Sequence, residues 1–163
     1  MPSDLPIPIR SDKDVITVGI DSSTKSCGIA IYRNGEYERS FTKTFDGIFD
    51  MEKLKLIIEF FNEFFADLLP DIVVIEEPLA IRNGRITRHL NLLGGAIFSS
   101  AHSLCQCVDF IHNKTVKRLM GVKSKEDSVR KAKDLLGIDC ETNDESDAIL
   151  IVESYKKLTY GNI

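Results

Sequence analysis

Three short strand-like runs follow one another in the first third of the chain, with no room for a helix between them. Residues 15–20 are near-continuously apolar and β-branched, residues 28–32 are apolar, and residues 37–45 alternate between apolar and polar side chains. Between the second and third runs, Asn34 and Gly35 form a dipeptide typical of a two-residue hairpin turn. Strands joined this tightly pair antiparallel, so the sequence predicts a three-stranded meander.

The rest of the chain alternates helical and strand-like segments. In order, we expect a helix over 50–69 capped by Asp50, a strand over 72–76, a helix over 81–104, a strand over 108–111, a basic connector over 113–125, and helices over 125–136 and 144–158. Strands separated by helices add to a sheet in parallel. The sequence therefore predicts an α/β fold with one mixed five-stranded sheet and helices on both faces.

The composition is that of a soluble globular chain of one domain. Its 163 residues, 43% hydrophobic and 28% charged, suffice to bury a sizeable core. Residues 1–14 contain three prolines and no apolar stretch, so we expect a flexible leader and then one domain over 15–163. No run approaches the length of a membrane span, so no membrane partner is expected. The four cysteines lack the spacing of a zinc site, which favours the reducing cytoplasm.

Charge is distributed unevenly along the chain, whose net charge is −4. Eleven of the 21 Lys and Arg residues lie between Arg82 and Lys133, a segment that holds only three of the 25 acidic residues. Such asymmetry indicates a basic surface beside an acidic one, although a charge cluster is also compatible with a merely solvated helix surface.

Acidic side chains stand where three apolar segments end. Asp21 follows the first buried run, and Glu76 and Glu77 close the buried strand in the middle of the chain. In the last helix, Asp144 and Asp147 lie one turn apart on one face. Taken singly, each acid has an ordinary structural explanation in a turn, in solvent or at a helix N-terminus.

The last helix has a clear start and a clear apolar stripe. Thr142 and Glu145 have the spacing of a capping box. The predicted stripe, which the two aspartates continue towards the N-terminus, consists of Ala148, Ile151, Val152, Tyr155 and Leu158. The sequence therefore places both carboxylates on the face that packs inward.

Taken together, the acids need another explanation, because burying several carboxylates without a cation is costly. Mg²⁺ or Mn²⁺ resolves this conflict, since both prefer carboxylate oxygens and keep water ligands for a phosphate substrate. Two such ions can activate a water and stabilise the leaving oxygen in phosphoryl transfer, while the basic segment binds a phosphate backbone. The pattern therefore predicts a metal-dependent enzyme that acts on nucleic acid.

Four stretches resemble the motifs of one known family, the RuvC-like Holliday junction resolvases of the ribonuclease H-like, retroviral-integrase superfamily. The family's first motif is similar to VGIDSSTKSCGIAIY and its second to VVIEEP. Its basic third region resembles NKTVKRLMGVKSKEDSVRKA, and its last motif resembles NDESDAILIVESY. The resemblance covers residues 15–158 and implies a ribonuclease H-like sheet. The short length and the leader are typical of a phage-type or divergent member.

The resemblance implies a Mg²⁺-dependent endonuclease that resolves four-way DNA junctions as a homodimer, by paired symmetric nicks. Asp21 and Glu76 take the places of the family's first two carboxylates, and Asp144 and Asp147 take those of the last pair. These four would hold two Mg²⁺ ions, for which Mn²⁺ can substitute. Lys117 falls where the family has a basic residue near the scissile phosphate.

Further basic residues are expected to contact DNA. Lys125 lies close to a second basic position of the family. The arginines that begin the 81–104 helix either bind phosphates or only cover the surface, and the sequence leaves both open. The full expected set is Arg82, Arg85, Arg88, Lys114, Lys117, Arg118, Lys123 and Lys125. Glu77 is a reserve ligand, because adjacent strand residues point to opposite faces.

The helix over 81–104 has the place of the family's dimer-forming helix. Its small residues would let a second helix approach closely, and packing on its own sheet is the alternative. Pro78 and Leu79 stand where the family has an aromatic residue associated with opening the junction. This departure leaves the opening of the junction and the sequence preference undetermined.

Three other functions remain open. A broader nuclease for flaps and forks would use the same carboxylates. GIDSSTKSCGIA also resembles the first phosphate loop of sugar kinases and actin-like ATPases, but those need a second glycine-rich loop and a second domain, for which this chain is too short. A junction-binding protein without catalysis is the third alternative, although a full set of acids argues against it.

Overall fold

The computed structural model describes residues 13–77 and 82–161. Its elements are β1 (Ile16–Ser22), β2 (Ser26–Arg33), β3 (Glu36–Thr44), α1 (Met51–Leu68), β4 (Ile72–Glu77), α2 (Gly84–His102), β5 (Cys107–His112), α3 (Asn113–Met120), α4 (Lys125–Leu136) and α5 (Asn143–Tyr160). Most of the predicted leader lies outside the described residues, as do Pro78 and Leu79.

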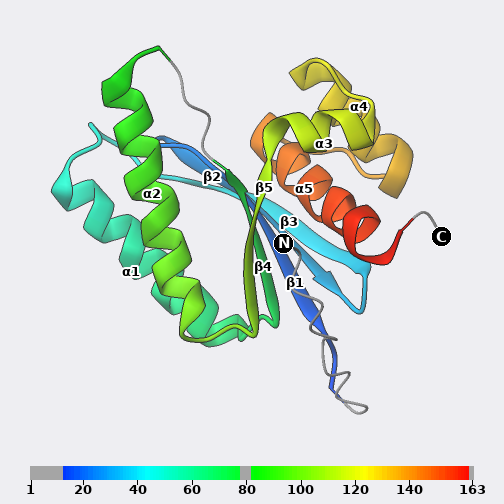
Figure 1. Ribbon diagram of the computed structural model, residues 1–163, viewed down its shortest axis with the longest axis horizontal. Coiled ribbons are helices and arrows are strands. Elements are labelled where there is room, and N and C mark those ends of the chain that lie inside the picture. Colours follow the sequence, from blue (N-terminus) through cyan, green and yellow to red (C-terminus); the bar gives the residue numbers. More distant parts are fainter. Residues whose placement is uncertain (1–12, 78–81, 162–163) are drawn as a thin grey trace.

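The strands form one five-stranded sheet in the order β3-β2-β1-β4-β5. The first three strands pair antiparallel, and β4 and β5 add in parallel, which confirms the predicted meander and mixed sheet. Asn34 and Gly35 both have positive φ, at 54° and 80°, as a hairpin turn that follows the twist of the strands requires. Figure 1 shows α1 and α2 on one face of this sheet and α3, α4 and α5 on the other.

The face under α1 and α2 is a continuous apolar core. Asp50 caps α1 by accepting a hydrogen bond from the backbone N–H of Lys53 at 2.9 Å. The side chains of α1 at helical spacing then meet alternate residues of the strands. Fully buried side chains in this core include Val18, Ile20, Ile29, Ile31, Ile57, Phe61, Phe65, Val73, Ile75, Leu93 and Ile97. The sheet is therefore covered on this face by a packed apolar layer.

On the other face, α5 lies unusually close to the sheet because two glycines face it. A Cβ at Gly19 would stand 2.6 Å from the carbonyl oxygen of Ala148, and one at Gly28 would stand 1.8 Å from that of Asp144. Only a residue without a side chain fits at either position. The strands β1 and β2 therefore bring the first turn of α5 against the end of the sheet.

Asp71 fixes the register of three strands where they begin. Its carboxylate accepts a hydrogen bond from the backbone N–H of Ile16 at 2.9 Å, and its carbonyl oxygen accepts those of Gln106 and Cys107, each at 3.0 Å. Register at the start of β1, β4 and β5 determines which residues meet at their other end. The candidate site lies at that other end.

Two predictions about the helices on the α5 face, one for α3 and one for α5, were wrong. The connector expected over 113–125 contains a helix, α3, in which only Val116 and Met120 are buried. A helix with so short a buried stripe and so many basic residues carries little periodic signal. Leu158, predicted on the inward stripe of α5, is 53% exposed, in the last turns of the helix where the neighbouring residues are also exposed. No helix in the described parts of the chain is long and apolar enough to cross a membrane.

Candidate active site

Asp21 lies near the C-terminal end of β1 with its side chain on the α5 face. Strand residues alternate between faces, so Asp21 shares this face with Thr17 and Gly19, whereas Val18 and Ile20 enter the α1–α2 core. Its partner across β2 is Gly28, the glycine against which α5 packs. Asp21 therefore lies at the C-terminal end of the central strand, next to the start of α5.

The parallel pairing of β4 with β1 places Glu76 beside Asp21. Ile20 pairs with Ile75, so the following residues of the two strands are neighbours at the end of the sheet. Asn113, the first residue of α3, donates a side-chain hydrogen bond to Oε1 of Glu76. Glu77 is exposed and points to the opposite face. The structure thus places Glu76, and not the reserve residue Glu77, beside Asp21.

The first turn of α5 supplies the other two carboxylates. Thr142 caps the helix by accepting a hydrogen bond from the backbone N–H of Glu145 at 3.1 Å. The hydroxyl of Ser40 on β3 donates to the Glu145 carboxylate at 2.6 Å, which ties this turn to the sheet. Asp144 accepts a hydrogen bond from the hydroxyl of Ser26, and Asp147 follows one turn later, half-buried. The helix start is therefore anchored on both sides of Asp144.

The acids perturb one another's protonation. Burial raises the pKa of Asp21 well above its ordinary value of 3.8, and a hydrogen bond shared with Glu76 and the charges of the other acids raise it further. Burial also raises the pKa of Asp147; a hydrogen bond with Ser128 and the nearby Lys125 ammonium oppose this, and the charges of the neighbouring carboxylates add to it. Negative charge is therefore concentrated at this end of the sheet without full compensation.

The donor set fits a hard divalent cation. All four side chains are carboxylates, and none of them forms an ion pair with a described Lys or Arg. No three Asp, Glu, His or Cys side chains in the described residues form a closed coordination group as they are placed.

A cleft of about 240 Å³ joins two of the four carboxylates to a basic rim. Glu76, Asp147 and Asn113 lie along it together with Lys117, Lys123 and Lys125. None of these three lysines forms an ion pair with a described residue. The cleft therefore combines an acidic wall with free ammonium groups within one small volume, which suits a phosphate bound through cations on both sides.

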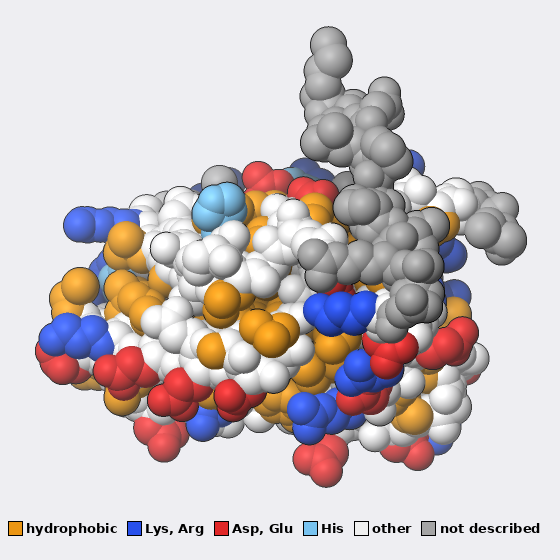
Figure 2. Space-filling model, turned by 90° about the horizontal axis from the view of Figure 1, so that it is seen from below, with side chains coloured by type: hydrophobic (Ala, Val, Ile, Leu, Met, Phe, Trp, Pro, Cys, Tyr) orange, Lys and Arg blue, Asp and Glu red, His pale blue; other side chains and the backbone are white. Residues whose placement is uncertain are grey.

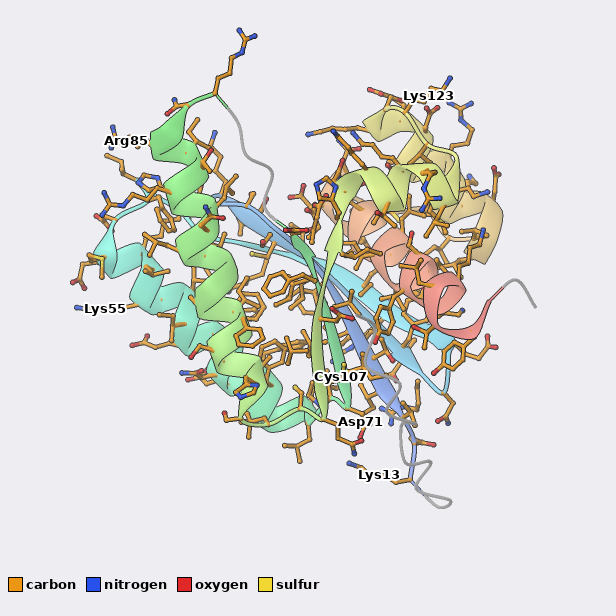
Figure 3. All side chains as sticks on the ribbon, viewed as in Figure 1. Lys13, Lys55, Asp71, Arg85, Cys107 and Lys123 are labelled. Carbon is orange, nitrogen blue, oxygen red and sulfur yellow. The ribbon has the colours of Figure 1, made fainter. Side chains whose placement is uncertain are left out.

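The remaining predicted DNA contacts are spread around the site. Lys114 and Arg118 are exposed on α3 but do not line the cleft. Arg82, Arg85 and Arg88 are exposed at the start of α2, on the other side of the sheet. Figure 3 shows Arg85 and Lys123 flanking the same end of the molecule, with Lys13 and Asp71 at the opposite end. The predicted contacts therefore frame the site from two sides.

The opposite end of the molecule has a different surface. Seen from below in Figure 2, it shows acidic side chains along one edge, with basic and hydrophobic side chains interspersed. At this end, Nζ of Lys13 lies 3.9 Å from Oδ1 of Asp71. Lys13 here has an acidic partner, in contrast to the lysines of the cleft.

Sequence reasoning missed three polar residues that contact the acids, namely Ser26, Asn113 and Ser128. Ser26 and Asn113 donate hydrogen bonds to Asp144 and Glu76. Ser128, whose hydroxyl donates to the Ser124 carbonyl oxygen at 3.3 Å, opposes the rise that burial causes in the pKa of Asp147. A signal for Asn113 was present, because it directly follows a strand that runs parallel to β4 and ends at the same edge. Ser26 and Ser128 have no such local signal.

Comparison with known proteins settles the fold. No protein-family model and no curated protein matches the sequence. Among solved structures, RuvC of Thermus thermophilus superimposes with a TM-score of 0.72 at 16% identity, over 90% of this chain and 97% of that one. The chain has the RuvC fold. The same protein solved in complex with a Holliday junction substrate also gives 0.72, over 89% of this chain and 96% of that one.

A second resolvase has the same architecture. The yeast mitochondrial Holliday junction resolvase Ydc2 superimposes with a TM-score of 0.66 at 14% identity, over 89% of this chain and 79% of that one. The predicted resemblance is thus confirmed for the RuvC-type, ribonuclease H-like architecture. At such low identity the likeness establishes the fold, and activity has to be argued from the residues of this chain.

Proposed function

We propose that this chain is a Mg²⁺-dependent, structure-specific DNA endonuclease that resolves four-way junctions by paired symmetric nicks in the cytoplasm, with residues 15–163 as one nuclease domain. The observation that carries the proposal is the proximity of four carboxylates from β1, β4 and α5, two of which, Glu76 and Asp147, line a cleft with three lysines. A binding protein would have no need to gather like charges against its DNA ligand, because they repel phosphate. A nuclease that recruits metal does need them.

The proposed metal ligands are Asp21, Glu76, Asp144 and Asp147. Two Mg²⁺ ions held there would activate the attacking water and stabilise the leaving oxygen of the phosphodiester. The protein itself contributes a rigid sheet end, which fixes the spacing between the ligands of β1 and β4, and a helix whose first turn is tied to Ser26 and Ser40. Burial of Asp21 strengthens its attraction to any cation that enters.

The basic residues would bind the DNA around this centre. Lys117 and Lys125 line the cleft with Glu76, so their ammonium groups can reach the oxygens of a phosphate lying across the carboxylates. Lys114, Arg118 and Lys123 would hold the backbone on one side of the site, and the three arginines at the start of α2 would hold it on the other. Binding of this kind weakens steeply as the salt concentration rises.

A second copy of the chain would supply the second nick. Support comes from α2, where Gly95 is exposed with open space around it and Leu92 is 45% exposed. A groove there is lined by Thr87, Arg88 and Ala96 among others. Small residues beside exposed apolar ones allow two helices to approach closely, which supports α2 as the dimer contact.

The test is to incubate the intact protein with an immobile four-way DNA junction, in Mg²⁺ and in EDTA, beside a linear duplex and a flap of the same sequence. We expect symmetric nicks on the junction in Mg²⁺ or Mn²⁺ and none in EDTA. Ca²⁺ should support binding with little cutting, because its looser coordination misplaces the attacking water.

Each other outcome has a definite meaning. Equal cutting of the flap and the junction would keep the metal site and favour the broader branched-DNA nuclease. Junction binding without cutting in either metal would favour the binding protein without catalysis. Binding of ATP without DNA binding would favour the ATPase alternative.

A further inference from the structure

We propose that Asn113 and Ser26 are positioning residues for the metal site, each holding one carboxylate through a neutral hydrogen bond. This inference rests on the proposed function, because a metal site gives the arrangement its purpose. The two residues come from different elements, α3 and β2, and reach different acids. Neither residue is itself a metal ligand in this account.

Asn113 holds Glu76. Its amide Nδ2 donates to Oε1 of Glu76, and both side chains line the cleft with Lys117 and Asp147. Asn113 is kept there because β5 pairs in parallel with β4 up to the residue before it, and the backbone then turns into α3. Oε1 is thus engaged, and Oε2 keeps its lone pairs for another partner.

Ser26 holds Asp144. Its hydroxyl donates to Oδ2 of Asp144, from the first position of β2. Two residues further along β2, Gly28 admits the backbone of Asp144 against the strand. The strand therefore sets both the height of the first turn of α5 and the orientation of its first candidate ligand.

The neutrality of the donors is the reason for assigning them this role. A Lys or Arg in the same place would hold the carboxylate equally well, but its charge would compete with a cation for it. Elsewhere the chain does use charged pairs, as between Arg33 and Glu38 at 2.8 Å and between Lys133 and Asp139 at 2.6 Å. At the site, amide and hydroxyl donors orient the acids and leave their charge in place.

Orientation matters because the acids repel one another. A carboxylate released from its donor would turn towards solvent, away from the like charges that raise the pKa of Asp21. Metal binding would then have to restore its position at the expense of affinity. Removing a hydrogen-bond partner of a metal ligand typically weakens metal affinity by about 10–100-fold.

The experiment is a Mn²⁺ titration of the intact chain without DNA, with free Mn²⁺ measured by electron paramagnetic resonance. Asn113→Ala and Ser26→Ala should each weaken Mn²⁺ binding by about 10–100-fold. Asn113→Leu keeps the side-chain volume and should weaken it as much as Asn113→Ala. Ser26→Thr retains the hydroxyl in a strand and should restore wild-type affinity.

Matched controls are Asn62→Ala on α1 and Ser103→Ala at the end of α2, both exposed and far from the acids in the fold. They should bind Mn²⁺ as the wild type does. Melting temperatures in EDTA should stay within a few degrees of wild type for all variants, which separates orientation of the acids from folding.

The outcomes are distinguishable from those of the proposed function. If the wild type binds Mn²⁺ and Asn113→Ala and Ser26→Ala bind it equally well, the positioning role is overturned while the metal site stands. If Ser26→Thr is as weak as Ser26→Ala, the hydroxyl is not what holds Asp144. If the wild type binds no Mn²⁺, the proposed function itself fails.

Discussion

The two faces of the sheet are formed by the same strands but carry different kinds of side chain. Under α1 and α2, alternate residues such as Ile20 and Ile75 join a layer of buried aromatic and aliphatic side chains. Under α5, the strands also bury apolar residues such as Val74 and Ala30, but they carry glycines, which let the helix approach, and acids at the strand ends. Burial of apolar side chains stabilises the face under α1 and α2. The face under α5 is less stable than it could be, because it brings negatively charged carboxylates close together. The candidate site lies on the α5 face.

The largest effect is expected from removing the most buried acid. Asp21→Asn should reduce junction nicking by at least about a thousand-fold, because a bound metal contributes several kcal/mol to transition-state stabilisation. Junction binding in EDTA should be kept or strengthened, because a negative charge near the phosphates is lost. The measurement is a single-turnover nicking assay beside a gel-shift titration.

The matched control is Asp134→Asn, which changes an exposed aspartate on α4. It should nick at the wild-type rate. Full activity of Asp21→Asn would remove Asp21 from the metal set, and loss of junction binding would mean that the substitution harms more than the metal site.

A substitution in the core under α1 and α2 should lower stability without changing Mn²⁺ affinity. Phe61→Ala removes a fully buried ring from the α1–α2 core and should lower the free energy of unfolding by about 3–5 kcal/mol. Mn²⁺ affinity of the folded fraction should remain within about twofold of wild type, since affinity depends on the α5 face. Urea unfolding and Mn²⁺ titration at low temperature provide the two measurements. A parallel loss of affinity would show that the faces are not independent.

Adding a side chain between β2 and α5 should lower both the stability and the Mn²⁺ affinity. Gly28→Ala places a Cβ where the Asp144 carbonyl lies, so the first turn of α5 must shift. We expect a loss of about 1–3 kcal/mol in stability and a clear loss of Mn²⁺ affinity. Gly84→Ala, at a glycine with open space around it, is the control and should change neither property. Wild-type metal affinity in Gly28→Ala would contradict the role of the close approach.

The smallest effect is a pH dependence of stability in EDTA. Because the pKa of Asp21 is raised in the folded state, the folded chain binds more protons than the unfolded chain between about pH 3.8 and that raised pKa. Stability should therefore fall as pH rises through the folded pKa, by about 1.4 kcal/mol for each pH unit at most. Thermal melts across this range check the slope. Saturating Mg²⁺ should abolish it, and an identical slope in Asp21→Asn would assign it to another group.

Much of the fold followed from local pattern. The α4 bounds match the predicted helix over 125–136, and the hairpin at Asn34 and Gly35 has the predicted backbone. In both cases the signal lies within a few residues, in a cap, a turn dipeptide or a periodic stripe. The helix α3 was missed because basic residues outnumber its two buried ones.

The candidate site was predictable only in part, for a physical reason. Acids at the ends of apolar segments are visible locally, and parallel strands end at a common edge, so the meeting of Asp21 and Glu76 could be anticipated. The partners Ser26 and Asn113 depend on register and on the height of α5 above the sheet, which no local pattern encodes. These contacts join residues 118 and 37 positions apart in the chain.

The most direct test of the central claim, that the acids under α5 form a metal centre, is a crystal grown with Mn²⁺ and measured at the manganese absorption edge. We expect anomalous density between Asp21, Glu76, Asp144 and Asp147, which should disappear in Asp21→Asn crystals grown alike. Density only at other surface acids, or none at saturating Mn²⁺, would contradict it.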